Sequence, residues 1–100
     1  MPRTRCFVFM DGREVEAASA VGFFDALRRT EPAPPPDVGR YLELLRARAG
    51  VFYGVDFDVG HPGLDLATRC QDALESLMSH GWVRVKPERH ASGGPQLLLR

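Results

Sequence analysis

The sequence predicts an α+β protein with an N-terminal β-hairpin, three helices and a C-terminal β-hairpin. Two short runs of alternating apolar residues flank an Asp-Gly pair near the start of the chain, and apolar residues recur at helical spacing through its middle. Two further apolar runs, 82–87 and 95–100, flank a glycine-containing loop. A chain of 100 residues is expected to form one domain, residues 1–100. Within it, a proline-rich spacer at 32–36 would separate a hairpin-helix portion from a helix-strand-helix-hairpin portion.

The first hairpin is predicted around Asp11-Gly12, because a two-residue type I′ turn needs positive φ at both central residues and favours this pair. Phe7 and Phe9 would point to one face, and Val15 and Ala17 would continue that inward row on the return strand. A hairpin alone is only marginally stable in water, so we expect a helix to pack on its apolar face.

The first helix is predicted to follow Ser19, a typical N-cap residue, with apolar residues at helical spacing from Ala20 to Leu27. Phe23 and Phe24 are adjacent and cannot both face inward on one narrow stripe. We therefore expect one of them, or the leucines at 97–99, to lie at the surface as a contact for a partner. The prolines at 32–36 cannot continue a helix and end it.

The second helix is predicted over 38–50, with Asp37 as its N-cap and Gly50 as the residue that ends it. Its outer face carries a mildly basic set of side chains: Arg40, Arg46 and Arg48. Residues 55–59 then alternate apolar and acidic residues as a strand with one buried face would, and a turn follows.

The third helix is predicted from its N-cap Asp65 to Met78, and Gly81 stops it. Directly after it, Trp82 has two interpretations. It packs beneath the third helix as part of the core, or it is an exposed anchor for a partner protein.

The charges limit the classes of partner. Thirteen basic and thirteen acidic residues cancel, so no global field attracts nucleic acid or a membrane surface. No apolar run approaches the ~18 residues of a membrane-spanning helix.

Cys6 and Cys70 lie in apolar contexts without metal-ligand spacing, and we interpret them as buried thiols in a reducing compartment, although a disulfide between them stays open. A cytoplasmic location, with no cofactor and no bound metal, is the expectation.

Asp56 and Asp58 form a DxD pair after apolar residues, which resembles the first motif of haloacid-dehalogenase-type phosphatases. In that family the first aspartate is a nucleophile, the second an acid/base, and Mg²⁺ binds the carboxylates. Strand alternation explains the same pair without chemistry, as two aspartates on a solvated face. The enzyme hypothesis predicts that both carboxylates line a pocket.

The C-terminal third resembles the second half of a winged-helix domain. In that family a helix of this pattern is followed by a β-wing, and the matching residues here are Ala73, Leu74, Leu77, Gly81, Trp82 and Val83. The resemblance implies that the third helix enters the DNA major groove and that Lys86, Arg89 and His90 contact phosphates. The arginines at 40, 46 and 48 would extend this surface if they shared its face.

The charge of the third helix argues against DNA binding. Its exposed positions hold Asp65, Asp72 and Glu75 against Arg69 alone, whereas a helix in the major groove normally presents basic or amide side chains. Winged-helix folds also serve as protein-interaction modules, and a fold does not determine a function.

No nucleophile elbow, P-loop or dinucleotide-binding motif occurs in the sequence, so an enzyme is the least supported class. We therefore expect a small non-enzymatic binding or regulatory module that recognises another protein, with a homodimer as one form of that contact. The predicted contact residues are Phe23, Trp82, Leu97 and Leu99. A winged-helix DNA-binding regulator is the alternative, and a DxD metal-dependent enzyme is the third hypothesis.

Overall fold

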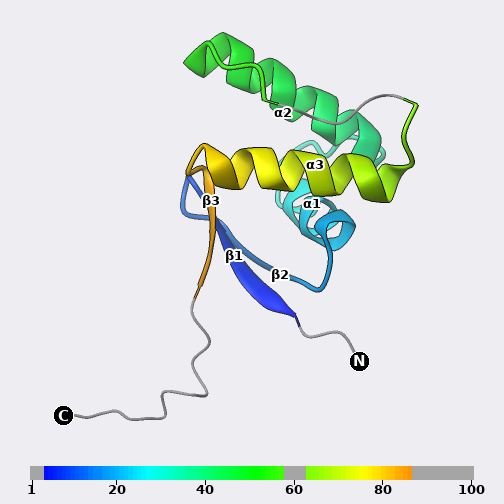
Figure 1. The fold of residues 1–100 in the computed structure, drawn as a ribbon, viewed down its shortest axis with the longest axis vertical. Coiled ribbons are helices and arrows are strands. Elements are labelled where there is room, and N and C mark those ends of the chain that lie inside the picture. The colour runs from blue at the N-terminus through cyan, green and yellow to red at the C-terminus, as the bar shows by residue number, and fades with distance from the viewer. Residues whose placement is uncertain (1–3, 58–62, 87–100) are drawn as a thin grey trace, which may run out of the picture.

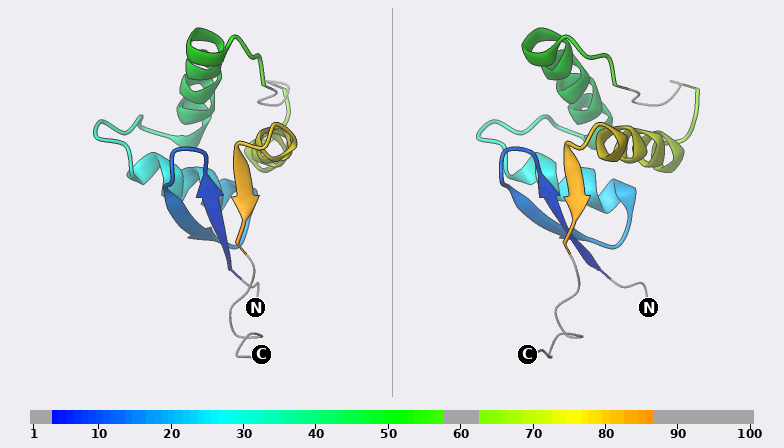
Figure 2. Two further views of the ribbon diagram at one scale, coloured as in Figure 1. Left: turned by 90° about the vertical axis from the view of Figure 1, so that its left-hand side faces the viewer. Right: turned by 60° about the vertical axis from the view of Figure 1, so that its left-hand side comes forward.

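The predicted α+β class is confirmed. The computed structural model describes residues 4–57 and 63–86, which form three helices and one three-stranded antiparallel sheet. The elements in chain order are β1 (Arg5–Phe9), β2 (Glu14–Ala17), α1 (Ala20–Arg29), α2 (Val38–Tyr53), α3 (Leu66–Ser79) and β3 (Val83–Val85). Helices α1 and α3 pack on one face of the sheet, and α2 lies beyond them, at the end of the molecule away from the start of β1 (Figures 1 and 2).

The N-terminal hairpin has the predicted inward row but a different turn. Phe7 pairs with Val15, and the inward residues of both strands are buried. Gly12 has a φ of 97°, whereas Asp11 has a negative φ, so the turn is not type I′. The Phe9 N–H donates to the Arg13 carbonyl, which closes a three-residue loop with glycine in the left-handed region. The Asp11 carboxylate accepts the Arg13 N–H across this loop.

The third strand pairs with the N-terminal hairpin. In the sheet order β2-β1-β3, Val85 lies opposite Phe7 and Val83 lies opposite Phe9, so β1 is the central strand. The two portions on either side of the proline-rich spacer therefore share one sheet. The second strand of the predicted C-terminal hairpin, at 95–100, lies outside the described residues.

Both phenylalanines of α1 are buried, so of the two expected surface contacts only the leucines at 97–99, which lie outside the described residues, stay a prediction. Phe23 and Phe24 are each fully inaccessible to solvent. The Phe23 ring packs edge-on against Phe7 of the sheet at a centroid distance of 5.1 Å, and against Phe24 at 4.9 Å. Helix α1 contacts the sheet as well as α2 and α3, so its buried stripe is wide enough for both rings. Phe23 is a core residue, and its predicted role as a surface contact is wrong.

Helix α2 is longer than the sequence predicted. Asp37 caps its start as expected, since Asp37 Oδ1 accepts the Arg40 N–H at 2.8 Å. The helix continues through Gly50 to Tyr53 and ends at Gly54, whose φ is 65°. The Val55 N–H then donates to the carbonyl of Ala49, which satisfies a carbonyl in the last turn.

The strand predicted at 55–59 is not formed in its described part. Residues 55–57 follow the helix end directly and form neither helix nor strand, while residues 58 and 59 lie outside the described residues. Phe57 nevertheless enters the core and is only 2% exposed.

The two glycines at the end of α2 are expected to respond in opposite ways to alanine. Gly50→Ala is expected to stabilise the fold by up to about 1 kcal/mol, because alanine favours a helix interior and, beyond the local helix backbone, nothing lies within 4 Å of the new Cβ. Gly54→Ala is expected to destabilise it by about 1–2 kcal/mol, because alanine disfavours the left-handed region. Urea unfolding followed by circular dichroism measures both. A loss of stability in Gly50→Ala would contradict the helix end described here.

Candidate functional site

Trp82 is the centre of an aromatic cluster at the end of α3. Its ring centroid lies 5.0 Å from that of His80, 5.4 Å from that of Tyr53 and 6.3 Å from that of Phe57. Phe57 is buried, Tyr53 is exposed, and Trp82 itself is half-buried. Trp82 was interpreted from the sequence either as a core residue or as an exposed anchor. Its indole ring packs on the core and also exposes part of its surface to solvent.

A groove of about 170 Å³ opens beside this cluster. The tip of the β1–β2 hairpin forms one wall and the C-terminal part of α2 forms the other, with Trp82, Phe57 and Leu77 between them. The left panel of Figure 2 looks onto this side of the molecule, where the hairpin tip lies beside the end of α3 and α2 rises above both. We call this feature the Trp82 groove; its lining is Phe9, Met10, Asp11, Arg13, Leu45, Arg48, Ala49, Phe52, Tyr53, Phe57, Leu77 and Trp82.

Large apolar side chains are exposed on the α2 wall of the groove. On this wall Phe52 and Tyr53 are 72% and 56% exposed, and Met10 on the hairpin tip is 42% exposed. Val51 precedes them outside the lining of the groove and is 78% exposed. Three consecutive exposed apolar residues on the last turn of a helix leave apolar surface in contact with water. Such exposed apolar surface, when it is contiguous and has polar residues at its edge, marks interaction sites.

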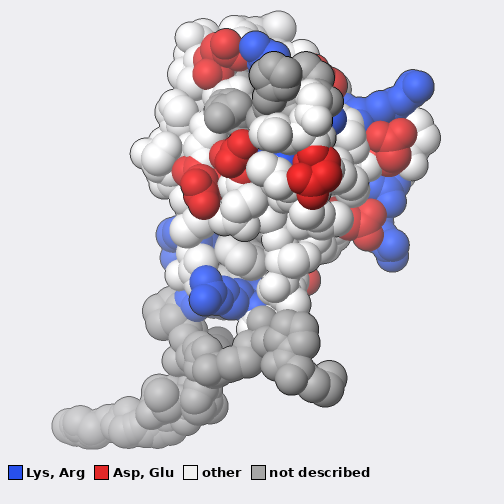
Figure 3. Space-filling view, turned by 45° about the vertical axis from the view of Figure 1, so that its right-hand side comes forward, with Lys and Arg blue, Asp and Glu red and all other residues white. Residues whose placement is uncertain are grey.

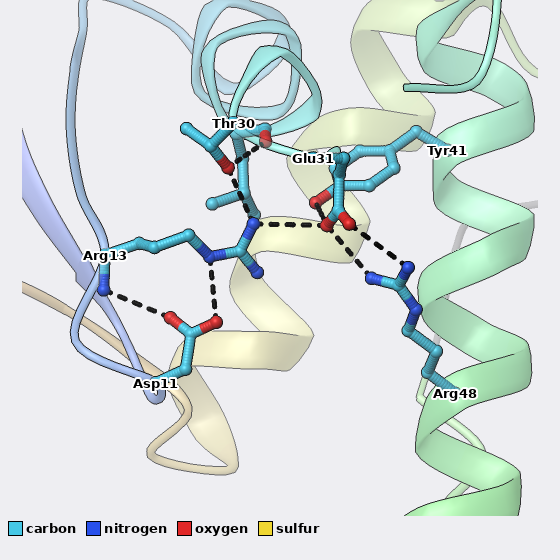
Figure 4. Close-up of polar contacts among 7 residues, drawn as sticks. Asp11, Arg13, Thr30, Glu31, Tyr41 and Arg48 are labelled. Carbon is cyan, nitrogen blue, oxygen red and sulfur yellow. Dashed lines mark hydrogen bonds and ion pairs between the residues drawn. The ribbon is translucent and has the colours of Figure 1, made fainter. Parts of the chain in front are cut away.

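A buried carboxylate holds the two walls of the Trp82 groove together (Figure 4). Arg48 of α2 donates two hydrogen bonds to Glu31, at 2.9 Å and 3.1 Å, and Arg13 of the hairpin donates a third at 3.1 Å. The Tyr41 hydroxyl donates a fourth at 2.7 Å. Asp11 accepts from Arg13 Nε at 2.8 Å and so orients the guanidinium. We call these five residues the Glu31 network.

The electrostatics of the Glu31 network keep the carboxylate charged. The Arg48 hydrogen bonds are the main cause that lowers the pKa of Glu31 to about 2, against its burial. Burial and the hydrogen bond to Glu31 raise the pKa of Tyr41, so its hydroxyl keeps its proton and donates. Two guanidinium groups face two carboxylates here, so the network is close to neutral. Its role is to fix the hairpin tip against α2.

No pattern in the sequence indicated this network. Glu31 stands just before the proline-rich spacer, where no motif distinguishes it. An acidic residue between a helix end and a proline run carries no sequence signal for burial. The arginines that complete the network lie 18 and 17 residues away in the chain.

The side chains predicted for nucleic-acid binding do not form one surface in the described residues. Arg40 pairs with Asp37 at 3.7 Å, Arg46 with Asp56 at 2.7 Å, and Arg48 with Glu31 at 2.9 Å. All three arginines belong to α2, whereas Lys86 follows β3 at the other end of the molecule and pairs with Glu14 at 3.2 Å. Arg89 and His90 lie outside the described residues.

The charge distribution agrees with that separation. On the face shown in Figure 3, acidic side chains are spread over the upper half with basic ones among them at the top and the right-hand edge, and a separate basic group lies at the lower left. No continuous basic band crosses the described part of this face.

Of the two aspartates of the DxD pair, only Asp56 lies among the described residues. Asp56 is exposed, and Arg46 binds both of its oxygens, at 2.7 Å and 3.3 Å. That hydrogen-bonded guanidinium lowers the pKa of the carboxyl group. Asp58 lies outside the described residues. Within the described ranges, no group of three or more His, Cys, Asp or Glu side chains is arranged to hold a metal ion.

The remaining predictions concern thiols and the C-terminal residues. Cys70 is buried as expected, whereas Cys6 is only half-buried, and neither forms a disulfide. Burial raises the pKa of both thiols. Leu97 and Leu99, predicted as contacts, lie outside the described residues. None of the described helices is long and apolar enough to cross a membrane.

The fold and the site together define an α+β protein with an apolar groove, whose walls are held by a buried carboxylate network. Comparisons with models of protein families, with curated proteins and with solved structures found no match to this chain.

Proposed function

We propose that this protein is a small non-enzymatic binding module that recognises another protein through the Trp82 groove. The observation that carries the proposal is the exposure of Val51, Phe52 and Tyr53 beside a groove lined mainly by apolar side chains. Interface centres are enriched in aromatic residues and methionine, and this groove presents Trp82, Tyr53, Phe52 and Met10.

The Glu31 network supports the same proposal because it makes the groove rigid. Arg13 and Arg48 come from opposite walls and are bound to one carboxylate. A groove whose walls are already ordered loses less conformational entropy when a partner binds. Substrate chemistry has no comparable support, because the nearest carboxylates are neutralised by arginines and the groove is mostly apolar.

Photo-crosslinking from residue 52 tests the proposal. With p-benzoylphenylalanine in place of Phe52, we expect a specific crosslinked protein that is absent when the probe replaces Leu66, an equally apolar residue at the other end of α3 that is 40% exposed. The captured protein is then purified and its affinity measured. Phe52→Ser should weaken its binding by at least about tenfold, as the loss of a central aromatic contact does. The proposal fails if both probe positions capture the same proteins, or if Phe52→Ser binds as tightly as the natural chain.

DNA binding by a winged-helix module is the alternative proposal, and it would rest on the basic residues of 84–90. A generic duplex at about 50 and about 200 mM salt separates the two proposals, because phosphate contacts give a steep loss of affinity with salt. Binding that collapses with salt and is unaffected by Phe52→Ser would favour the alternative.

A further inference from the structure

The C-terminal end of α2 projects from the molecule. Ala49 is the last buried residue of the helix, and the following residues 50–53 are all exposed. Figure 1 shows this end of α2 extending beyond α3. Phe52, at 72% exposure, is therefore an aromatic ring held out into solvent on a rigid helix. The next residue, Tyr53, packs instead against Trp82 at a centroid distance of 5.4 Å.

The Trp82 groove has the size to accept one such ring. Its volume is about 170 Å³, and an apolar cavity of about 150 Å³ holds a benzene molecule. The projecting ring and the groove lie on the same side of the chain, because Phe52 itself stands at the groove edge. Two copies related by a twofold axis near Phe52 would each place this ring over the groove of the other. This is the self-complementary contact of an isologous dimer.

The charges around the groove distinguish a second copy from a charged peptide. On the hairpin wall Asp11 is paired with Arg13, and on the α2 wall Arg48 is paired with the buried Glu31. The groove is therefore close to neutral, and the chain has a formal net charge of zero, so copies do not repel each other. A strongly acidic or basic partner finds no opposing field here.

We propose that the occupant of the Trp82 groove is a second copy of this chain, so that the protein forms a twofold dimer through Phe52. This inference rests on the proposed function and names its partner. The contact buries the exposed apolar side chains at the end of α2 together with Met10 of the hairpin tip. A small protein with surplus apolar surface commonly covers it in this way.

Sedimentation equilibrium of the purified full chain tests the dimer. Between about 1 μM and about 1 mM protein, we expect the mass of the natural chain to rise from that of a monomer towards twice that value. Phe52→Ser should raise the dimer dissociation constant by at least about tenfold, whereas the matched control Leu66→Ser should change it by less than about twofold. The dimer is overturned if the natural chain stays monomeric over the whole concentration range. It is also overturned if the natural chain, Phe52→Ser and Leu66→Ser all associate with the same dissociation constant.

A crosslinking experiment identifies the contact and separates the two proposals. Chains with p-benzoylphenylalanine at position 52 are mixed with ¹⁵N-labelled natural chains, so that contacts between copies differ in mass from contacts within one copy. We expect a crosslink from position 52 of one copy to the hairpin tip or Trp82 of the other. Crosslinks within a single copy only would overturn the dimer. In that case the capture of a different protein by the same probe, weakened by Phe52→Ser, would leave the proposed function standing.

Discussion

Glu31→Gln is expected to lower the free energy of unfolding by about 3–5 kcal/mol, the cost of removing one partner from a buried ion pair. The Glu31 side chain is 7% exposed and accepts hydrogen bonds from Arg13, Arg48 and Tyr41. Glutamine loses the charge that both guanidinium groups face, and it loses one acceptor oxygen. Urea unfolding followed by circular dichroism measures the change.

A surface pair provides the control for this substitution. Glu43 is 61% exposed and pairs with Arg69 at 3.4 Å, so Glu43→Gln should cost no more than about 1 kcal/mol. If the two glutamine variants lost equal stability, the Glu31 network would not hold the hairpin tip against α2 as described.

The same carboxylate predicts how stability depends on pH. The pKa of Glu31 is about 2 in the folded protein, below its ordinary value of 4.5. Its contribution is therefore fully present above pH 4.5 and is lost as the pH falls towards 2. The shift corresponds to about 3 kcal/mol. The difference in unfolding free energy between the natural chain and Glu31→Gln should shrink over that range, and a constant difference would contradict the cause assigned to the shift.

Phe23→Ala is expected to destabilise the fold by about 3–5 kcal/mol, the usual cost of removing a buried ring. Phe23 is fully buried between Phe7 of the sheet and Phe24 of its own helix. Its replacement opens a cavity between the sheet and α1. Phe52→Ala removes the same atoms from an exposed site, so in dilute protein it should change stability by no more than about 0.5 kcal/mol. Equal effects of the two substitutions would place Phe23 outside the core.

Local sequence signals predicted the secondary-structure elements that depend on neighbouring residues. The inward row of the hairpin follows from strand alternation, and the starts of α1 and α2 follow from the N-caps Ser19 and Asp37, which both accept a backbone N–H in the structure. These features involve residues only a few positions apart, so one sequence is enough to indicate them.

Features that depend on the tertiary arrangement were predicted less well. The end of α2 was placed at Gly50 because glycine usually ends a helix, but Gly54 provides the left-handed cap and the helix continues to it. Both rings of α1 are buried because two layers cover that helix, which its own periodicity does not reveal. For the same reason, β3 pairing with β1 could not be distinguished from a local C-terminal hairpin.

The candidate site shows the same division. Trp82 was identified from its position after the glycine that ends α3, and it lies in the groove. The other residues that define the groove come from the hairpin tip and the end of α2, and only folding brings them together. Phe52 was not identified, because the second helix was predicted to end at Gly50. Glu31 was not identified, because its partners are distant in the chain.

A dilution series of ¹H–¹⁵N correlation spectra tests the central claim most directly, since it reports association and its location in one experiment. We predict concentration-dependent shifts at Met10, Phe52, Tyr53 and the indole N–H of Trp82, with the backbone signals of Leu66 and Lys86 unchanged. Spectra that are independent of concentration, or shifts centred on residues away from the Trp82 groove, would contradict the assignment of this groove as the contact between copies.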